Sequence, residues 1–206
     1  MATLLLIISR LGLASLIGFE GLNWIGVLDF TLDFSWLGLI VTAVAVVAFL
    51  EGAAFLLKRT TGRGLHPVAY FAGAAGLAFD AIGDIAHLYG RFAWYDQVAH
   101  FLGGAVVGIV AFNVLWQLEQ AGRMRLGAGW RSLFVVSIGA FFGSLYEIEE
   151  YLEDLWKWHR QVRLGDGPDT ANDLLFNIVG AIAVVAAVVL WQRLRARSSA
   201  REYVPD

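Results

Sequence analysis

The sequence predicts an all-α membrane protein: a polytopic helical bundle of about six transmembrane helices in a single domain, residues 1–206. Hydrophobic residues make up 58% of the chain and charged residues only 16%, whereas soluble domains carry about 25% charged residues. The chain also contains 8 Trp, 6 Tyr and 14 Phe, residue types that anchor helices at the two membrane interfaces. This composition leaves no room for a large soluble domain.

Six windows are apolar over about 20 residues, the length that crosses a hydrocarbon core of about 30 Å. They are residues 3–24, 36–57, 68–89, 98–117, 132–151 and 173–193. We interpret the first as a retained span, because no positively charged segment precedes its apolar run. In the fourth and fifth windows Gly104 and Gly108, and Gly139 and Gly143, are four residues apart, a spacing that favours close helix packing.

The Lys and Arg residues indicate how the spans are oriented. Of the 15 such residues, ten follow the second, fourth and sixth windows or lie around the loops there: Lys58, Arg59, Arg63, Arg123, Arg125, Arg131, Arg193, Arg195, Arg197 and Arg201. Cytoplasmic loops of membrane proteins are enriched in positive charge. The sequence therefore predicts that both termini are cytoplasmic.

Composition also limits the chemistry. The chain has no cysteine, so a disulfide framework, a thiolate metal site and a Cys nucleophile are all excluded. The formal net charge of -3 and the scattered basic residues exclude a nucleic-acid surface. Any metal ion must therefore be held by oxygen and nitrogen ligands.

Ionisable residues in or near the spans gather at the predicted extracytoplasmic ends. Asp80, Asp84 and His87 follow each other at i, i+4 and i+7 in the third window, which places them on one helix face. The fourth window begins with Asp96 and His100. The fifth ends with Glu147 and Glu150, and the sixth begins with Asp173. Four helices thus bring carboxylates and histidines to one depth, and we expect these residues to face a common cavity.

A carboxylate inside a span costs about 2.5–3.5 kcal/mol on insertion scales unless water, a cation or a partner compensates it. A bound cation would relieve the mutual repulsion of the cluster, as would protonation or a water-filled vestibule. The predicted ligands of a divalent metal ion are Asp80, Asp84, His87, Asp96, His100, Glu147, Glu150 and Asp173. Carboxylates with imidazole suit Zn²⁺, Mn²⁺ or Fe²⁺, and carboxylates alone suit Mg²⁺ or Ca²⁺. The sequence does not choose among these ions.

Arg10 and Glu51 lie in the first and second windows at a matched depth near the cytoplasmic side. They are expected to form a structural ion pair that fixes helix register. Whether Glu20, near the outer end of the first window, and His159, in the last loop, join the cluster stays open.

The segment 95–104, the Tyr146–Glu150 end of the fifth window and the segment 165–173 resemble the YjdF-like family of uncharacterised bacterial inner-membrane proteins. The resemblance covers roughly residues 80–185. A looser one links Asp96, His100, Asp173, Asn177 and Gly180 to VanZ-like proteins, although the Gln and Arg that follow the Glu of that pattern are missing here. The resemblance implies a multi-pass protein of the bacterial cytoplasmic (inner) membrane. It favours Asp96, His100, Glu147, Asp169 and Asp173 as site residues and implies no activity.

Three functions fit these patterns. The first is a metal-dependent hydrolase or transferase that acts on a lipid or lipid-linked envelope substrate, with His100 and Glu147 as catalytic residues, each a metal ligand or a general base. The second is a cation or proton transporter or channel that uses the same carboxylates. The third is a non-catalytic membrane scaffold stabilised by metal. Membrane lipid is the expected partner in each case, and the oligomeric state is left open.

Overall fold

The computed structural model describes residues 2–157 and 167–202. The described residues form helices and no strands. The helices are α1 (Ala2–Trp24), α2 (Trp36–Thr61), α3 (Pro67–Ile85), α4 (Leu88–Arg91), α5 (Tyr95–Gln120), α6 (Gly127–Lys157) and α7 (Gly167–Glu202). All but the short α4 are long and apolar enough to cross a membrane. The six-span helical bundle predicted from the sequence is therefore confirmed.

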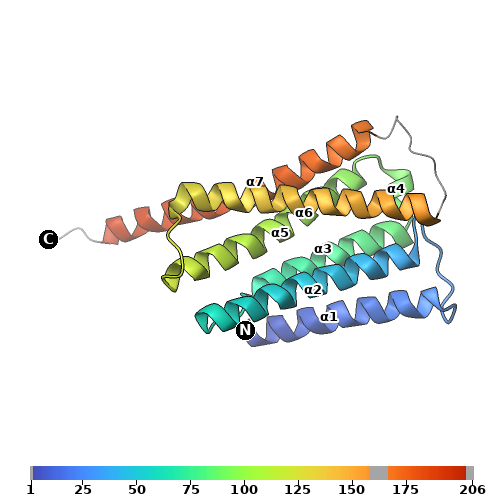
Figure 1. Cartoon of the computed structure of the whole chain (residues 1–206), viewed down its shortest axis with the longest axis horizontal. Coiled ribbons are helices and arrows are strands. Elements are labelled where there is room, and N and C mark those ends of the chain that lie inside the picture. The colour runs from blue at the N-terminus through green and yellow to red at the C-terminus, as the bar shows by residue number, and fades with distance from the viewer. Residues whose placement is uncertain (1, 158–166, 203–206) are drawn as a thin grey trace.

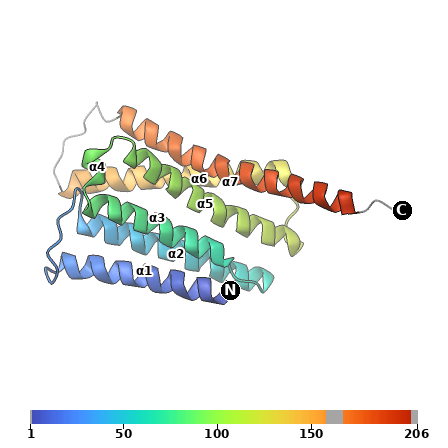
Figure 2. The ribbon, with the colours of Figure 1, turned by 180° about the vertical axis from the view of Figure 1, so that it is seen from behind.

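The long helices form two neighbouring groups (Figures 1 and 2). One group contains α1, α2 and α3, and the other contains α5, α6 and α7, with α5 also packing against α2 and α3. The N-terminus and the helical end of α7 lie toward one end of the bundle. The opposite end carries α4 and the connection 25–35, and we call it the α4 end. The polar residues of the site lie at this end.

Each group contains its own apolar core. In the first, Leu13, Leu50, Leu57 and Tyr70 are buried together, and Val110 of α5 packs with them. In the second, Ala111, Leu115 and Val135 form a smaller cluster. Much apolar surface stays exposed on the outer faces of the helices, as expected for side chains that face hydrocarbon.

Glycines allow α5 and α7 to approach closely. A Cβ placed on Gly104 would lie 2.0 Å from the carbonyl oxygen of Asn177, and one on Gly180 would lie 2.1 Å from that of Phe101. On α6, a Cβ on Gly143 would lie 2.9 Å from the Asn177 side chain. The close packing predicted from the glycine spacing is present, and it brings three site helices together around Asn177.

The third helix is shorter than the predicted window 68–89. It ends at Ile85, and His87 adopts a left-handed backbone conformation with φ of 55° before α4 begins. The prediction that Asp80, Asp84 and His87 share one helix face is therefore wrong for His87. Hydrogen bonds from His87 to the connection 25–35 account for this break, as described below.

The last two long helices extend further than predicted, so the connection between them is shorter than residues 152–172. Helix α6 reaches Lys157, and α7 begins at Gly167 with Pro168 next. Proline is favoured in the first turn of a helix, where its missing N–H has no partner to lose. His159 lies outside the described residues.

Arg10 of α1 and Glu51 of α2 form an ion pair, as expected from their matched depth. Arg10 Nε donates to Glu51 Oε1 over 2.8 Å and Nη2 donates to Oε2 over 2.7 Å. Nη2 also donates to the Tyr70 hydroxyl over 3.1 Å. This contact joins α1, α2 and α3 away from the α4 end.

Candidate metal centre at the α4 end

His100 lies at the centre of the polar cluster, one turn into α5, and its side chain is only 7% exposed. Its Nε2 atom lies 3.4 Å from Asp96 Oδ1 and 3.8 Å from Asp173 Oδ1. Its Nδ1 atom lies 3.6 Å from Glu147 Oε1. Helices α5, α6 and α7 each supply at least one carboxylate to the same imidazole ring.

The ligand atoms of this cluster fall into two overlapping groups with their donor atoms within 4.8 Å of one another. Asp96, His100 and Asp173 form the Nε2 group. His100, Glu147 and Glu150 form the second group. The structure therefore brings together five of the eight residues predicted as ligands.

Two carboxylate oxygens in the cluster are buried without a hydrogen-bond partner: Glu147 Oε1 and Asp173 Oδ1. Both point toward His100, at the distances given above. An unpaired buried polar atom costs free energy, and a charged one costs more. These two oxygens therefore require a further positive partner or a proton.

Asn177 of α7 holds the other side of the imidazole. Its side-chain amide lies 3.1 Å from His100 Nδ1, and Nδ2 donates to the Asp173 carbonyl oxygen over 3.0 Å. The Tyr146 ring meets the His100 ring edge to face, with centroids 5.6 Å apart. Neither Asn177 nor Tyr146 was chosen as a site residue from the sequence. Their positions become clear only from the helix packing.

Asp80 lies on α3 beside this cluster and has its own donor. The Tyr89 hydroxyl donates to Asp80 Oδ1 over 2.5 Å. Burial, and the neighbouring Asp80 carboxylate, raise the pKa of the Tyr89 phenol far above its usual value, so the phenol stays protonated and acts as a donor. Asp80, one of the predicted ligands, therefore already accepts a hydrogen bond from within the protein.

Asp84 and His87 bind the connection between α1 and α2 instead of joining either candidate ligand group. Asp84 Oδ1 accepts from the backbone N–H of Asp33 over 2.7 Å and of Phe34 over 2.9 Å. His87 Nδ1 lies 2.6 Å from Asp33 Oδ1, and Nε2 lies 3.0 Å from Thr31 Oγ1. These contacts give both residues a structural role at the α4 end. Asp84 and His87, like Asp80, therefore lie outside the two candidate ligand groups.

Glu20 of α1 is also buried, with 1% of its surface exposed, and its Oε2 has no hydrogen-bond partner. Asp80 is close enough for its charge to act on Glu20. Glu20 thus extends the acidic region toward α1. The sequence left its position open, because a residue near a helix end faces either the bundle or the lipid.

The spacing around His100 suits metal ligation better than direct hydrogen bonding. N–H···O hydrogen bonds are usually 2.7–3.2 Å long, and the three nitrogen–carboxylate distances are longer. A metal ion bound at about 2.0–2.2 Å in tetrahedral geometry holds its ligands roughly 3.4 Å apart. The Nε2 group has distances close to that separation.

One family model matches most of the chain. The family is described as "Predicted membrane protein (DUF2238)", and its model matches residues 14–194. The matched range contains all five residues of the two ligand groups. No curated protein and no solved structure matches the chain.

Proposed function

The chain belongs to the DUF2238 family of predicted membrane proteins, and we propose that it is a divalent-metal-dependent enzyme that acts on a lipid or lipid-linked substrate at the membrane face formed by the α4 end. One observation carries this proposal. Two buried carboxylate oxygens, Glu147 Oε1 and Asp173 Oδ1, point at opposite nitrogens of one buried histidine and lack any other partner. A cation bound beside His100 would compensate the negative charge of these two carboxylates.

The Nε2 side of His100 is the better position for the ion. Asp96 and Asp173 lie on that side, and Asn177 and Glu147 lie on the other. A histidine that binds a metal ion through one nitrogen usually donates its other N–H to a carboxylate or carbonyl, which fixes the ring. Glu147 is the carboxylate on the Nδ1 side, with its Oε1 atom 3.6 Å from Nδ1.

The donor set favours a borderline transition metal. One imidazole and two carboxylates suit Zn²⁺, Mn²⁺ or Fe²⁺ better than Mg²⁺ or Ca²⁺, which prefer oxygen alone. Such an ion polarises a phosphoryl or ester oxygen and lowers the pKa of a bound water molecule. Glu150 lies at the exposed edge of the cluster, where it is placed to accept a proton.

A lipid substrate follows from where the cluster lies. His100 is about 7 Å along the axis from the start of α5 at 1.5 Å per residue. A lipid headgroup, or the first carbons of the lipid chains, can reach His100 at that depth. The resemblance to YjdF-like proteins is consistent with a location in a membrane of the cell envelope. It does not indicate which substrate is bound.

Elemental analysis of purified protein tests the metal. We expect wild-type protein from cells grown in metal-replete medium to contain one transition-metal ion per chain, and Asp173→Asn and His100→Ala to contain none. Asp29→Asn is the control, because Asp29 is exposed in the connection at the same end. Wild-type protein free of metal after purification without chelators would contradict the proposal.

A proton or cation pathway is the second candidate, and Glu20 is the observation that favours it. Its buried, unpartnered oxygen beside Asp80 continues the acidic region from α5 through α3 to α1. In the other half of the described bundle, however, Arg10 pairs with Glu51 and Arg131 pairs with Glu119. Proton flux into vesicles that Glu20→Gln abolishes, with metal content unchanged, would favour this candidate.

A further inference from the structure

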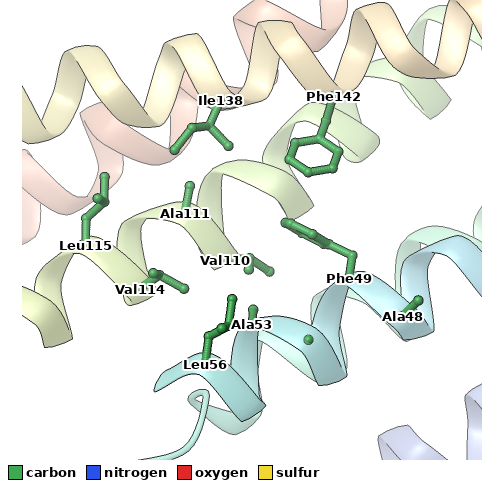
Figure 3. Close-up of a pocket in the computed structure, with 11 residues that line it drawn as sticks. Ala48, Phe49, Ala53, Leu56, Val110, Ala111, Val114, Leu115, Ile138 and Phe142 are labelled. Carbon is green, nitrogen blue, oxygen red and sulfur yellow. The ribbon is translucent and has the colours of Figure 1, made fainter. Parts of the chain in front are cut away.

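An apolar groove runs along α5 between α2 and α6 (Figure 3). Its volume is about 430 Å³, within the range of about 300–1,000 Å³ that is typical of ligand pockets. Every residue that lines it is apolar: Ala48, Phe49, Gly52, Ala53, Leu56, Val110, Ala111, Val114, Leu115, Ile138 and Phe142. No charged or hydrogen-bonding side chain reaches this space.

Small residues of α2 leave the groove open. Ala48 and Gly52 are one turn apart and exposed, so they form a mouth without bulky side chains. Val110, Ala111 and Leu115 of α5 form a buried floor. The helices on the two sides meet where the rings of Phe49 and Phe142 lie with centroids 4.6 Å apart.

The surroundings determine what fills this space. An apolar cavity does not hold water, which needs two to four polar partners. The groove lies within the membrane-spanning parts of α2, α5 and α6, and its mouth therefore opens on hydrocarbon. The occupant that fits this environment is a hydrocarbon chain.

The α6 wall of the groove leads toward the candidate metal centre. Phe142 and Tyr146 are four residues apart on α6, so they are neighbours on one face, and the Tyr146 ring contacts the His100 ring. On α5, Ala111 and Val114 share a face with His100, at 11 and 14 residues from it. The residues around His100 therefore lie beyond the Phe49–Phe142 contact, on the same faces of α5 and α6 as the groove.

We propose that the groove holds the hydrocarbon chain of the same lipid whose headgroup lies at the His100 centre. The position of the headgroup rests on the proposed function, whereas the binding of the chain does not. Leu115, at the far end, is about 22 Å from His100 along the helix axis, and half a hydrocarbon core is about 15 Å. The substrate class is therefore a lipid with a long chain that extends past the middle of the bilayer.

The probe is phosphatidylglycerol with one very long acyl chain, long enough to reach the far end of the groove, and a photoactivatable diazirine near the end of that chain. Wild-type protein is reconstituted in phosphatidylglycerol vesicles that contain a trace of this lipid. It is then solubilised with excess unlabelled lipid, so that freely exchanging lipid is diluted, and irradiated. We expect label on peptides of α2, α5 and α6 that line the groove. Label spread equally over the outer face of α1 would contradict the proposal.

Two glycines provide a matched pair of variants. Gly52 lines the groove and Gly12 lies on the exposed face of α1, and a Cβ on either meets no atom within 4 Å. We expect Gly52→Phe to fill the groove and lower the labelling roughly tenfold, equivalent to about 1.4 kcal/mol, whereas Gly12→Phe leaves it unchanged. Equal labelling in both variants would overturn the proposal.

Two further measurements separate the alternatives. If solubilised wild-type protein is a dimer that only Gly52→Phe converts to a monomer, a second copy fills the groove and the proposal is wrong. His100→Ala should lose metal and keep the labelled groove. If wild-type protein contains no metal but its groove is labelled, the proposed function is wrong and this inference stands. If the protein contains metal but its groove is not labelled, this inference is wrong and the proposed function stands.

Discussion

At the scale of single residues, the proposed metal site gives the carboxylates on the two sides of His100 different roles, as metal ligands or as groups that orient the imidazole ring. Asp96 and Asp173 lie on its Nε2 side, and Glu147 lies on its Nδ1 side. A carboxylate next to a ligating histidine raises the basicity of the ring and fixes its orientation. The two kinds of carboxylate should therefore respond differently to substitution.

Glu147→Gln tests the orienting role. The amide keeps the shape of the side chain and removes its charge, so we expect metal affinity to fall roughly 10–100-fold while the protein stays folded. Asp173→Asn removes a ligand atom and should abolish binding. Titration calorimetry of chelator-treated protein measures both variants. Equal losses in the two would show that Glu147 is itself a ligand.

The Arg10–Glu51 pair makes a second residue-scale prediction. Each side chain is nearly half exposed, at 49% and 44%, and faces hydrocarbon at that depth, so either charge without the other is poorly compensated. We expect Arg10→Met and Glu51→Gln each to destabilise the bundle more than the double variant. A double-mutant cycle on thermal unfolding should give a coupling of about 0.5–3 kcal/mol. Additive effects would mean that the pair does not stabilise the fold.

At the scale of helices, the α5–α7 contact holds the site because glycines permit it. A Cβ on Gly104 would lie 2.0 Å from the Asn177 carbonyl, and Asn177 is also the residue beside His100 Nδ1. Gly104→Ala must therefore move α7 away from α5. We expect a loss of stability of about 1–3 kcal/mol and weaker metal binding. Gly12→Ala, which meets no atom within 4 Å, is the control and should change neither.

The helices also show how far the sequence alone could predict the structure. Apolar length is a local property, and it located all six spans, although the ends of the helices lie up to nine residues beyond the predicted windows. The end of α3 was not predicted, because it depends on contacts between His87 and Thr31 or Asp33, which are more than fifty residues apart. For the same reason Asp84, placed correctly within its helix, was assigned to the metal and not to the backbone of residues 33 and 34. The groove between α2 and α6 left no pattern in the sequence.

At the scale of the whole molecule, the orientation in the membrane is a prediction from the ten basic residues named above. The chain has no cysteine, so single cysteines can report it. In intact cells a membrane-impermeant maleimide should label Asp29→Cys, in the connection at the α4 end, and should label Arg125→Cys only after permeabilisation. The reverse pattern would place the candidate metal centre on the cytoplasmic face.

The final prediction concerns the stability of the bundle as a whole. An ion on the Nε2 side of His100 would be held by α5 and α7, and Glu147 of α6 contacts the same histidine. Such an ion is released when these helices separate. A ligand that binds only the folded state stabilises it by about 2.7 kcal/mol at one hundred times its dissociation constant. For a chain of this size, that corresponds to a change of about 5–10 °C in the unfolding temperature.

We therefore expect EDTA to lower the unfolding temperature of wild-type protein by that amount and added metal to restore it. The temperature for His100→Ala should already be low and should not respond to either treatment. Asp84→Asn serves as the comparison, because the Asp84 carboxylate holds the connection 25–35 and is not part of the ligand groups. That variant should melt lower and still respond to EDTA, so that a general loss of stability is distinguished from a loss of metal.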